Sequence, residues 1–125
     1  MRQTIRLFLL FEGASFAVAG LVHSGALVGG YAHRQAGIAE STIAVVLLVG
    51  LGLTWVWPAH TRSIGLAAQA FALLGTLVGV FTIAIGVGPR TAPDVAYHGA
   101  ILVALVWGLL VAARAPADGA RVARG

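Results

Sequence analysis

Six ionisable side chains lie within or beside long apolar stretches of this sequence, and they are its strongest candidates for chemistry. In chain order they are Glu12, His23, His33, Glu40, Asp94 and His98. In hydrocarbon an ionisable group is costly unless it is paired or hydrated, and such groups are rare without a role. Their presence predicts either a functional site or a set of buried hydrogen bonds that hold helices together.

Helical spacing places several of these groups on common faces. Asp94 and His98 are four residues apart, which puts them on one face of a helix. Glu12 and His23 are eleven residues apart, about three turns at ~3.6 residues per turn. Each of these helices therefore presents one polar stripe, and the simplest arrangement points the stripes toward the axis of a bundle.

Imidazole and carboxylate groups together suit transition metals such as zinc, iron or copper. Helical bundles hold such metals with ligands that project inward from facing helices. The predicted ligands are His23, Glu40 and His98. His33 is a fourth candidate, and Asp94 is the expected acceptor for an imidazole N–H beside the metal. No cysteine and no Glu-x-x-His motif is present, so a thiolate site and the carboxylate-bridged di-iron pattern are not expected.

Three other functions fit the same residues. In a haem b electron carrier, His23 and His98 would be the axial ligands, and Arg34 and Arg90 would meet the propionates. A proton or ion pathway would use the carboxylates and imidazoles as successive proton- or ion-binding sites. A non-catalytic accessory subunit of a larger membrane complex would use them only to fix its fold. No nucleophile elbow or phosphate loop is present, so catalytic residues are not assigned and the question of enzyme activity stays open.

Purely structural explanations exist for the same groups. Asp94 is suited to cap the N-terminus of a helix. His23 and Glu40 are suited to form a buried pair that joins two helices. Glu12 is expected to hydrogen-bond Gln69, which lies at the same predicted depth on another segment.

Composition defines the elements that must position these side chains. The chain has 125 residues, of which 59% are hydrophobic and 10% are charged, and its mean hydropathy is +0.95. A soluble domain of this length would have about 25% charged residues. The eight basic residues are scattered, so a nucleic-acid-binding function is not expected. The composition predicts a protein whose main partner is the lipid bilayer.

Four apolar segments, separated by short polar breaks, are each close to the ~20 residues that a helix needs to cross a membrane. They span residues 5–29, 36–57, 63–88 and 93–113. The predicted fold is therefore an all-α transmembrane four-helix bundle with short loops. Residues 1–114 form its single domain, and residues 115–125 are expected to be a flexible tail.

The arginines predict the orientation of this multi-pass protein in a bacterial cell membrane. Six of the eight lie on the side of the two termini, and Arg34 and Arg90 lie on the other side. The positive-inside rule then places both termini in the cytoplasm. With alternating helix directions, five of the six ionisable groups, all except Glu12, fall in one layer in the outer third of the membrane.

Two small-xxx-small patterns predict close helix contacts, either within the chain or with a partner. They are Gly25 with Gly29 and Gly75 with Gly79. A second copy of the chain or another membrane subunit is the expected partner.

Overall fold

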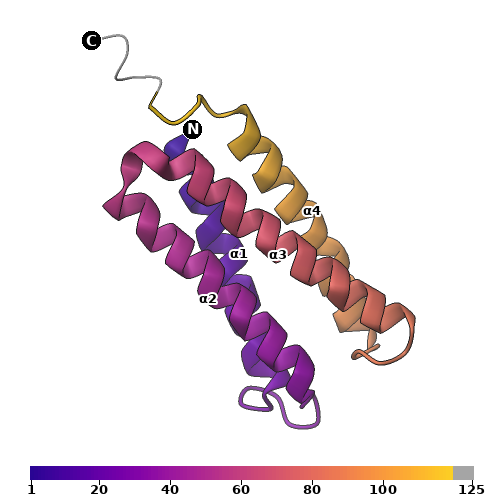
Figure 1. The fold of residues 1–125 in the computed structure, drawn as a ribbon. Coiled ribbons are helices and arrows are strands. Elements are labelled where there is room, and N and C mark those ends of the chain that lie inside the picture. The colour runs from indigo at the N-terminus through magenta and orange to yellow at the C-terminus, as the bar shows by residue number, and fades with distance from the viewer. Residues whose placement is uncertain (120–125) are drawn as a thin grey trace.

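Four antiparallel helices form a bundle in the computed structural model, which describes residues 1–119 (Figure 1). The helices are α1 (Arg2–His23), α2 (Arg34–Val56), α3 (Thr61–Ala84) and α4 (Ala92–Arg114), and a 3-10 turn at Pro58–His60 connects α2 to α3. The described residues contain no strand. All four helices are long and apolar enough to cross a membrane, which confirms the predicted all-helical fold with four candidate spans.

The two ends of the bundle differ in what they contain. Met1, the end of α4 and the α2–α3 connection lie together at one end, which we call the terminal end (Figure 1). The connection of residues 24–33 between α1 and α2 and that of residues 85–91 between α3 and α4 lie at the opposite end, the loop end. The polar residues at the end of α1 and at the starts of α2 and α4 are thereby gathered at the loop end.

Glycines end two helices earlier than the sequence predicts. The first helix ends at His23 instead of residue 29, and Gly25 and Gly30 in the following loop have φ of +79° and +86°. The third ends at Ala84 instead of residue 88, two residues before Gly86 with φ of +84°. Glycine reaches this left-handed region without a steric penalty, so it commonly follows the last turn of a helix.

One of the two predicted glycine contacts is wrong and the other is confirmed. Gly25 and Gly29 lie in the loop after α1, and a β-carbon added at Gly29 would meet no atom within 4 Å. In α3, a β-carbon at Gly75 would lie 2.8 Å from Ile43 Cδ1 of α2. At Gly79 it would lie 3.2 Å from Nε2 of His98 in α4. The second pair therefore allows α3 to approach both neighbouring helices.

Two other glycines bring α1 and α2 together at the loop end. A β-carbon at Gly20 would lie 2.6 Å from Ser41 Oγ, and one at Gly37 would lie 3.3 Å from the carbonyl carbon of His23. Small residues at helix contacts let backbones approach closely in this way. This approach determines how near the end of α1 lies to the first turns of α2.

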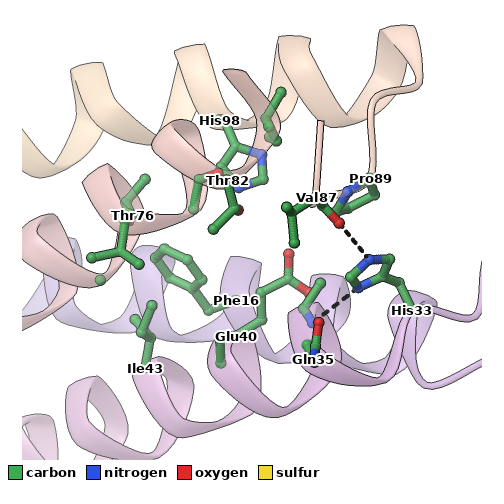
Figure 2. A pocket seen from close by; sticks show the side chains of 17 residues that line it. Phe16, His33, Gln35, Glu40, Ile43, Thr76, Thr82, Val87, Pro89 and His98 are labelled. Atoms are coloured by element: carbon green, nitrogen blue, oxygen red, sulfur yellow. Dashed lines mark hydrogen bonds between the residues drawn. The ribbon is translucent and has the colours of Figure 1, made fainter. Parts of the chain in front are cut away.

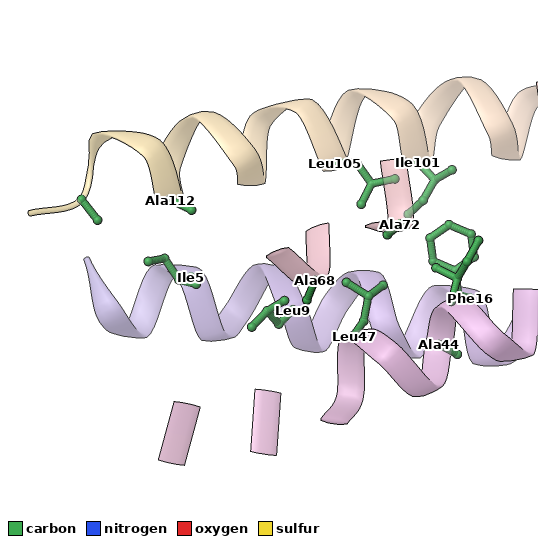
Figure 3. Close-up of a cluster of buried hydrophobic side chains, with 12 residues drawn as sticks. Ile5, Leu9, Phe16, Ala44, Leu47, Ala68, Ala72, Ile101, Leu105 and Ala112 are labelled. Atoms are coloured by element: carbon green, nitrogen blue, oxygen red, sulfur yellow. The ribbon is translucent and has the colours of Figure 1, made fainter. Parts of the chain in front are cut away.

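Large apolar side chains fill the axis of the bundle and also cover its outside. Buried residues from all four helices form one core, including Ile5, Leu9, Phe16, Leu47 and Leu105 (Figure 3). Many equally large apolar side chains are exposed on the outer faces of the helices. A helix that is apolar on every side is suited to a membrane rather than to water.

The residues after α4 pack against the start of α3. Asp118 accepts hydrogen bonds from the backbone N–H groups of Arg62, at 3.2 Å, and Ser63, at 2.9 Å, and from the Ser63 hydroxyl. Partial burial acts to raise the pKa of Asp118, but these hydrogen bonds outweigh it and the pKa is lowered. Asp118, in the segment predicted to be a flexible tail, thereby satisfies orphan N–H groups of α3. Residues 120–125 lie outside the described part of the chain.

Candidate functional site

A buried histidine at the loop end lies between two carboxylates from different helices. His23 Nδ1 is 2.6 Å from Glu40 Oε2, and His23 Nε2 is 3.0 Å from Asp94 Oδ1. The three residues belong to α1, α2 and α4 and are only 4–5% exposed. When the imidazole is protonated, it donates to both carboxylates. We call Glu40, His23 and Asp94 the polar array.

Local structure explains why these three side chains meet. His23 is the last residue of α1, and the approach at Gly37 brings it against α2 beside Glu40. Asp94 is in the first turn of α4, where the N-cap residue Thr91 and Asp94 form a capping box. One Asp94 oxygen accepts from Thr91, and the other faces His23. Asp94 therefore caps its helix and also orients an imidazole, so the two predicted contacts coexist.

His98 lies close to the polar array but does not hydrogen-bond to any of its three side chains. Its Nδ1–H donates to the backbone carbonyl of Asp94, one turn earlier in α4, at 2.7 Å. In the neutral imidazole this bond leaves Nε2 as an acceptor with a free lone pair. Nε2 is the atom that approaches Gly79 of α3, so it faces the space between α3 and α4.

A cavity of about 240 Å³ lies at the loop end between α2, α3 and α4 (Figure 2). Glu40 and His98 line it from opposite sides, and the Glu40 carboxyl group points into it. Glu40 Oε1 is buried and has no hydrogen-bond partner. Most of the remaining wall is apolar, with Phe16, Ile43, Val78, Ile83 and Val87 among its residues.

Two hydroxyl groups of α3 also line this cavity. Thr76 donates to the carbonyl of Ala72 at 2.7 Å, and Thr82 donates to the carbonyl of Gly79 at 2.7 Å. Both hydroxyl protons are therefore used by the helix itself, and the oxygens keep their lone pairs. Sequence reasoning did not assign these threonines to the site. Their position three residues on either side of Gly79 was the available signal.

His33, the predicted fourth ligand, joins the two loops at the rim of the cavity. Its Nδ1 accepts from the backbone N–H of Ala36 at 3.2 Å and so caps α2. Its Nε2–H faces the carbonyl of Val87, in the α3–α4 connection, at 3.3 Å (Figure 2). Both nitrogens of His33 thus have partners in the protein.

The side chains proposed as metal ligands do not converge on one point. Each nitrogen of His23 faces a carboxylate, and His98 directs its free nitrogen toward Gly79 rather than toward the array. Within residues 1–119, no three His, Cys, Asp or Glu side chains are grouped so that they could hold a metal ion. Arg34 and Arg90, the predicted propionate partners, lie at the loop end but do not line the cavity. Binding of a metal or of haem at these residues would need their hydrogen bonds to rearrange.

The predicted inner pair is present as a separate feature. Gln69 Nε2 lies 3.1 Å from both oxygens of Glu12, and neither residue has any exposed surface. The pair links α1 to α3, and Gly108 of α4 lies directly against it. Neither Glu12 nor Gln69 lines the cavity at the loop end.

Comparison of this chain with protein-family models, curated proteins and solved structures gave no match.

Proposed function

We propose that this chain is a multi-pass membrane protein that binds a small, largely apolar molecule in the cavity at the loop end. The observation that carries the proposal is the unpartnered Glu40 Oε1 in the wall of that cavity. A buried polar atom without a partner costs roughly 1–3 kcal/mol. A ligand that supplies a hydrogen bond to this oxygen would offset that cost, whereas a purely structural pair with His23 needs only the other oxygen.

The size of the cavity limits the ligand. A cavity of about 150 Å³ with apolar walls is known to hold benzene, and this one measures about 240 Å³. One six-membered ring with a short polar substituent fits such a volume. An apolar wall with a few convergent polar groups is also the usual character of a small-molecule site.

The arginine distribution supports a specific orientation for this site. Of the described arginines, Arg2, Arg6, Arg62 and Arg114 lie at the terminal end and two lie at the loop end, and two more follow α4 in the sequence. This distribution favours both termini in the cytoplasm of a cell. The loop end, and with it the cavity, then lies toward the outer face of the cell membrane. A ligand would enter from that side or from the outer leaflet.

Ligand-observed NMR tests the proposal on the full chain in mild detergent. Toluene, benzyl alcohol and benzylamine serve as one-ring probes. At least one should show saturation transfer that is lost in Ala36→Phe, because Ala36 lines the cavity and a phenyl group would fill it. Val45→Phe adds the same ring on the exposed face of the same helix and should leave the signal unchanged. If Ala36→Phe and Val45→Phe behave alike for every probe, the cavity is not a binding site.

The other predicted functions remain open to direct measurement. Elemental analysis and a visible spectrum of the same preparation test for zinc, iron, copper and haem b. Cross-linking in the membrane tests for a second copy or another subunit as partner. The hydrogen bonds of His23 and His33 within the protein favour an organic ligand over a metal ion as the occupant of this site.

A further inference from the structure

The buried wall of the cavity offers hydrogen-bond acceptors to a ligand, and these acceptors indicate which functional group the ligand has. We infer that the ligand is a small organic cation, a protonated amine attached to an apolar body. This inference rests on the proposed binding function and names the class of molecule bound at that same site. It follows from the hydrogen bonds and the charge around the cavity, taken in turn.

The hydrogen bonds leave acceptors but few donors in the buried wall. Glu40 Oε1 has no partner, and when the His98 ring is neutral its Nε2 keeps a lone pair, because Nδ1–H donates to the carbonyl of Asp94. The hydroxyl protons of Thr76 and Thr82 are committed to backbone carbonyls. At the rim, the His33 Nε2–H faces Val87, and the Gln35 amide is exposed. A ligand must therefore supply donors to pair with the buried groups, and an ammonium group supplies three.

The charge of the site favours a cation over a neutral donor. The polar array holds two carboxylates but only one imidazole, so with both acids ionised and the imidazole protonated it retains one negative charge. None of the arginines within residues 1–119 lines the cavity, and the chain has no lysine. An uncompensated charge in an apolar environment is costly. A bound ammonium would neutralise it beside Glu40 Oε1, and a carboxylate ligand would add to it.

The neighbouring groups on α2 and α3 do not supply that compensation. His33 and Arg34 lie at the start of α2, and Tyr97 and His98 lie on α4 near the array. His33 is held by two hydrogen bonds, and Arg34 is exposed and outside the cavity. From α3 the cavity receives hydroxyls and apolar groups only. The position beside Glu40 is therefore left for a positive group on the ligand.

Competition among matched one-ring probes tests the inference in the unmodified chain. At pH 7, benzylamine should bind about tenfold or more tightly than benzyl alcohol or toluene, as expected for a hydrogen bond between charged groups. Benzoate should not compete. Affinities are measured by titration calorimetry in a non-ionic detergent, which limits the difference in partitioning between probes.

Two variants then locate the preference at Glu40. Glu40→Gln should remove the preference for benzylamine and leave the weak binding of toluene. Glu12→Gln removes an equally buried acid outside the cavity and should keep the preference. If benzyl alcohol binds as tightly as benzylamine to the unmodified chain, the ligand is not selected as a cation although the cavity is a site. If no probe binds, the binding function itself is wrong.

Discussion

Alanine at position 108 should destabilise the bundle, although alanine is the better helix former. A β-carbon at Gly108 in α4 would overlap Gln69 Nε2 and would lie 2.8 Å from Glu12 Oε1. Neither Gln69 nor Glu12 has exposed surface, so neither side chain can move into solvent. The added methyl group must therefore separate the amide from the carboxyl group or push α4 away from α1 and α3.

The size of the effect follows from three opposing contributions. Overpacking of a tight core costs about 1–3 kcal/mol, and a buried polar group that loses its partner costs about 1–3 kcal/mol. Replacing glycine by alanine in a helix returns about 1 kcal/mol. Since a shift of α4 and a loss of the Glu12–Gln69 hydrogen bonds each relieve the same clash, only one of the two costs applies. After the gain in helix propensity, we expect Gly108→Ala to lower the free energy of unfolding by up to about 2 kcal/mol, and to be about 1–3 kcal/mol less stable than a glycine-to-alanine change that makes no clash.

A second glycine of the same helix provides the control. Gly99 is exposed, and a β-carbon there would meet no atom within 4 Å, so Gly99→Ala should be neutral or slightly stabilising. Unfolding by sodium dodecyl sulfate, followed by circular dichroism in mixed micelles, gives both free energies. In a Gln69→Ala background the cost of Gly108→Ala should shrink, because the amide that it meets is gone. Equal stability of Gly108→Ala and Gly99→Ala would show that α4 does not pack against the inner pair.

Three further outcomes are expected. Gly75→Ala should lower thermal stability in detergent by roughly 1 kcal/mol or more, because the added methyl group contacts α2. Gly29→Ala should not, because no atom lies near its β-carbon. A larger loss for Gly29→Ala than for Gly75→Ala would place Gly29 in a helix contact. Asp118→Ala should cost about 1 kcal/mol, like loss of a helix cap. The pKa of Asp118 is lowered in the folded chain, so its contribution to stability should be complete above the usual aspartate pKa of about 4 and be lost as the pH falls through the folded-state pKa. Unfolding of the unmodified chain and of Asp118→Ala over a series of pH values measures this difference. Reporter fusions after Gly125 and within residues 30–35 should report opposite sides of the membrane, the first cytoplasmic, and a common location would contradict the four-span topology.

Much of the fold could be predicted from sequence because hydropathy is a property of each residue and is summed along the chain. Long apolar segments with short polar breaks determine four helices, and an even number of helices returns the chain to its starting side. The position of a residue along its helix also gives its depth in the membrane. The Glu12–Gln69 pair was predictable from that depth. Helix ends were predicted less well, because a glycine that continues a helix and one that ends it, such as Gly25, are the same residue in the sequence.

The candidate site depended on contacts that sequence spacing does not contain. Depth predicted that His23, Glu40 and Asp94 would share a layer, but only the packing of α1 against α2 and α4 decided that His23 would lie between the two carboxylates. The rotation of α4 about its own axis decided that His98 would hydrogen-bond to its own backbone and turn its free nitrogen toward α3. The cavity is the space that small residues leave between three helices, and it exists only once those helices are packed.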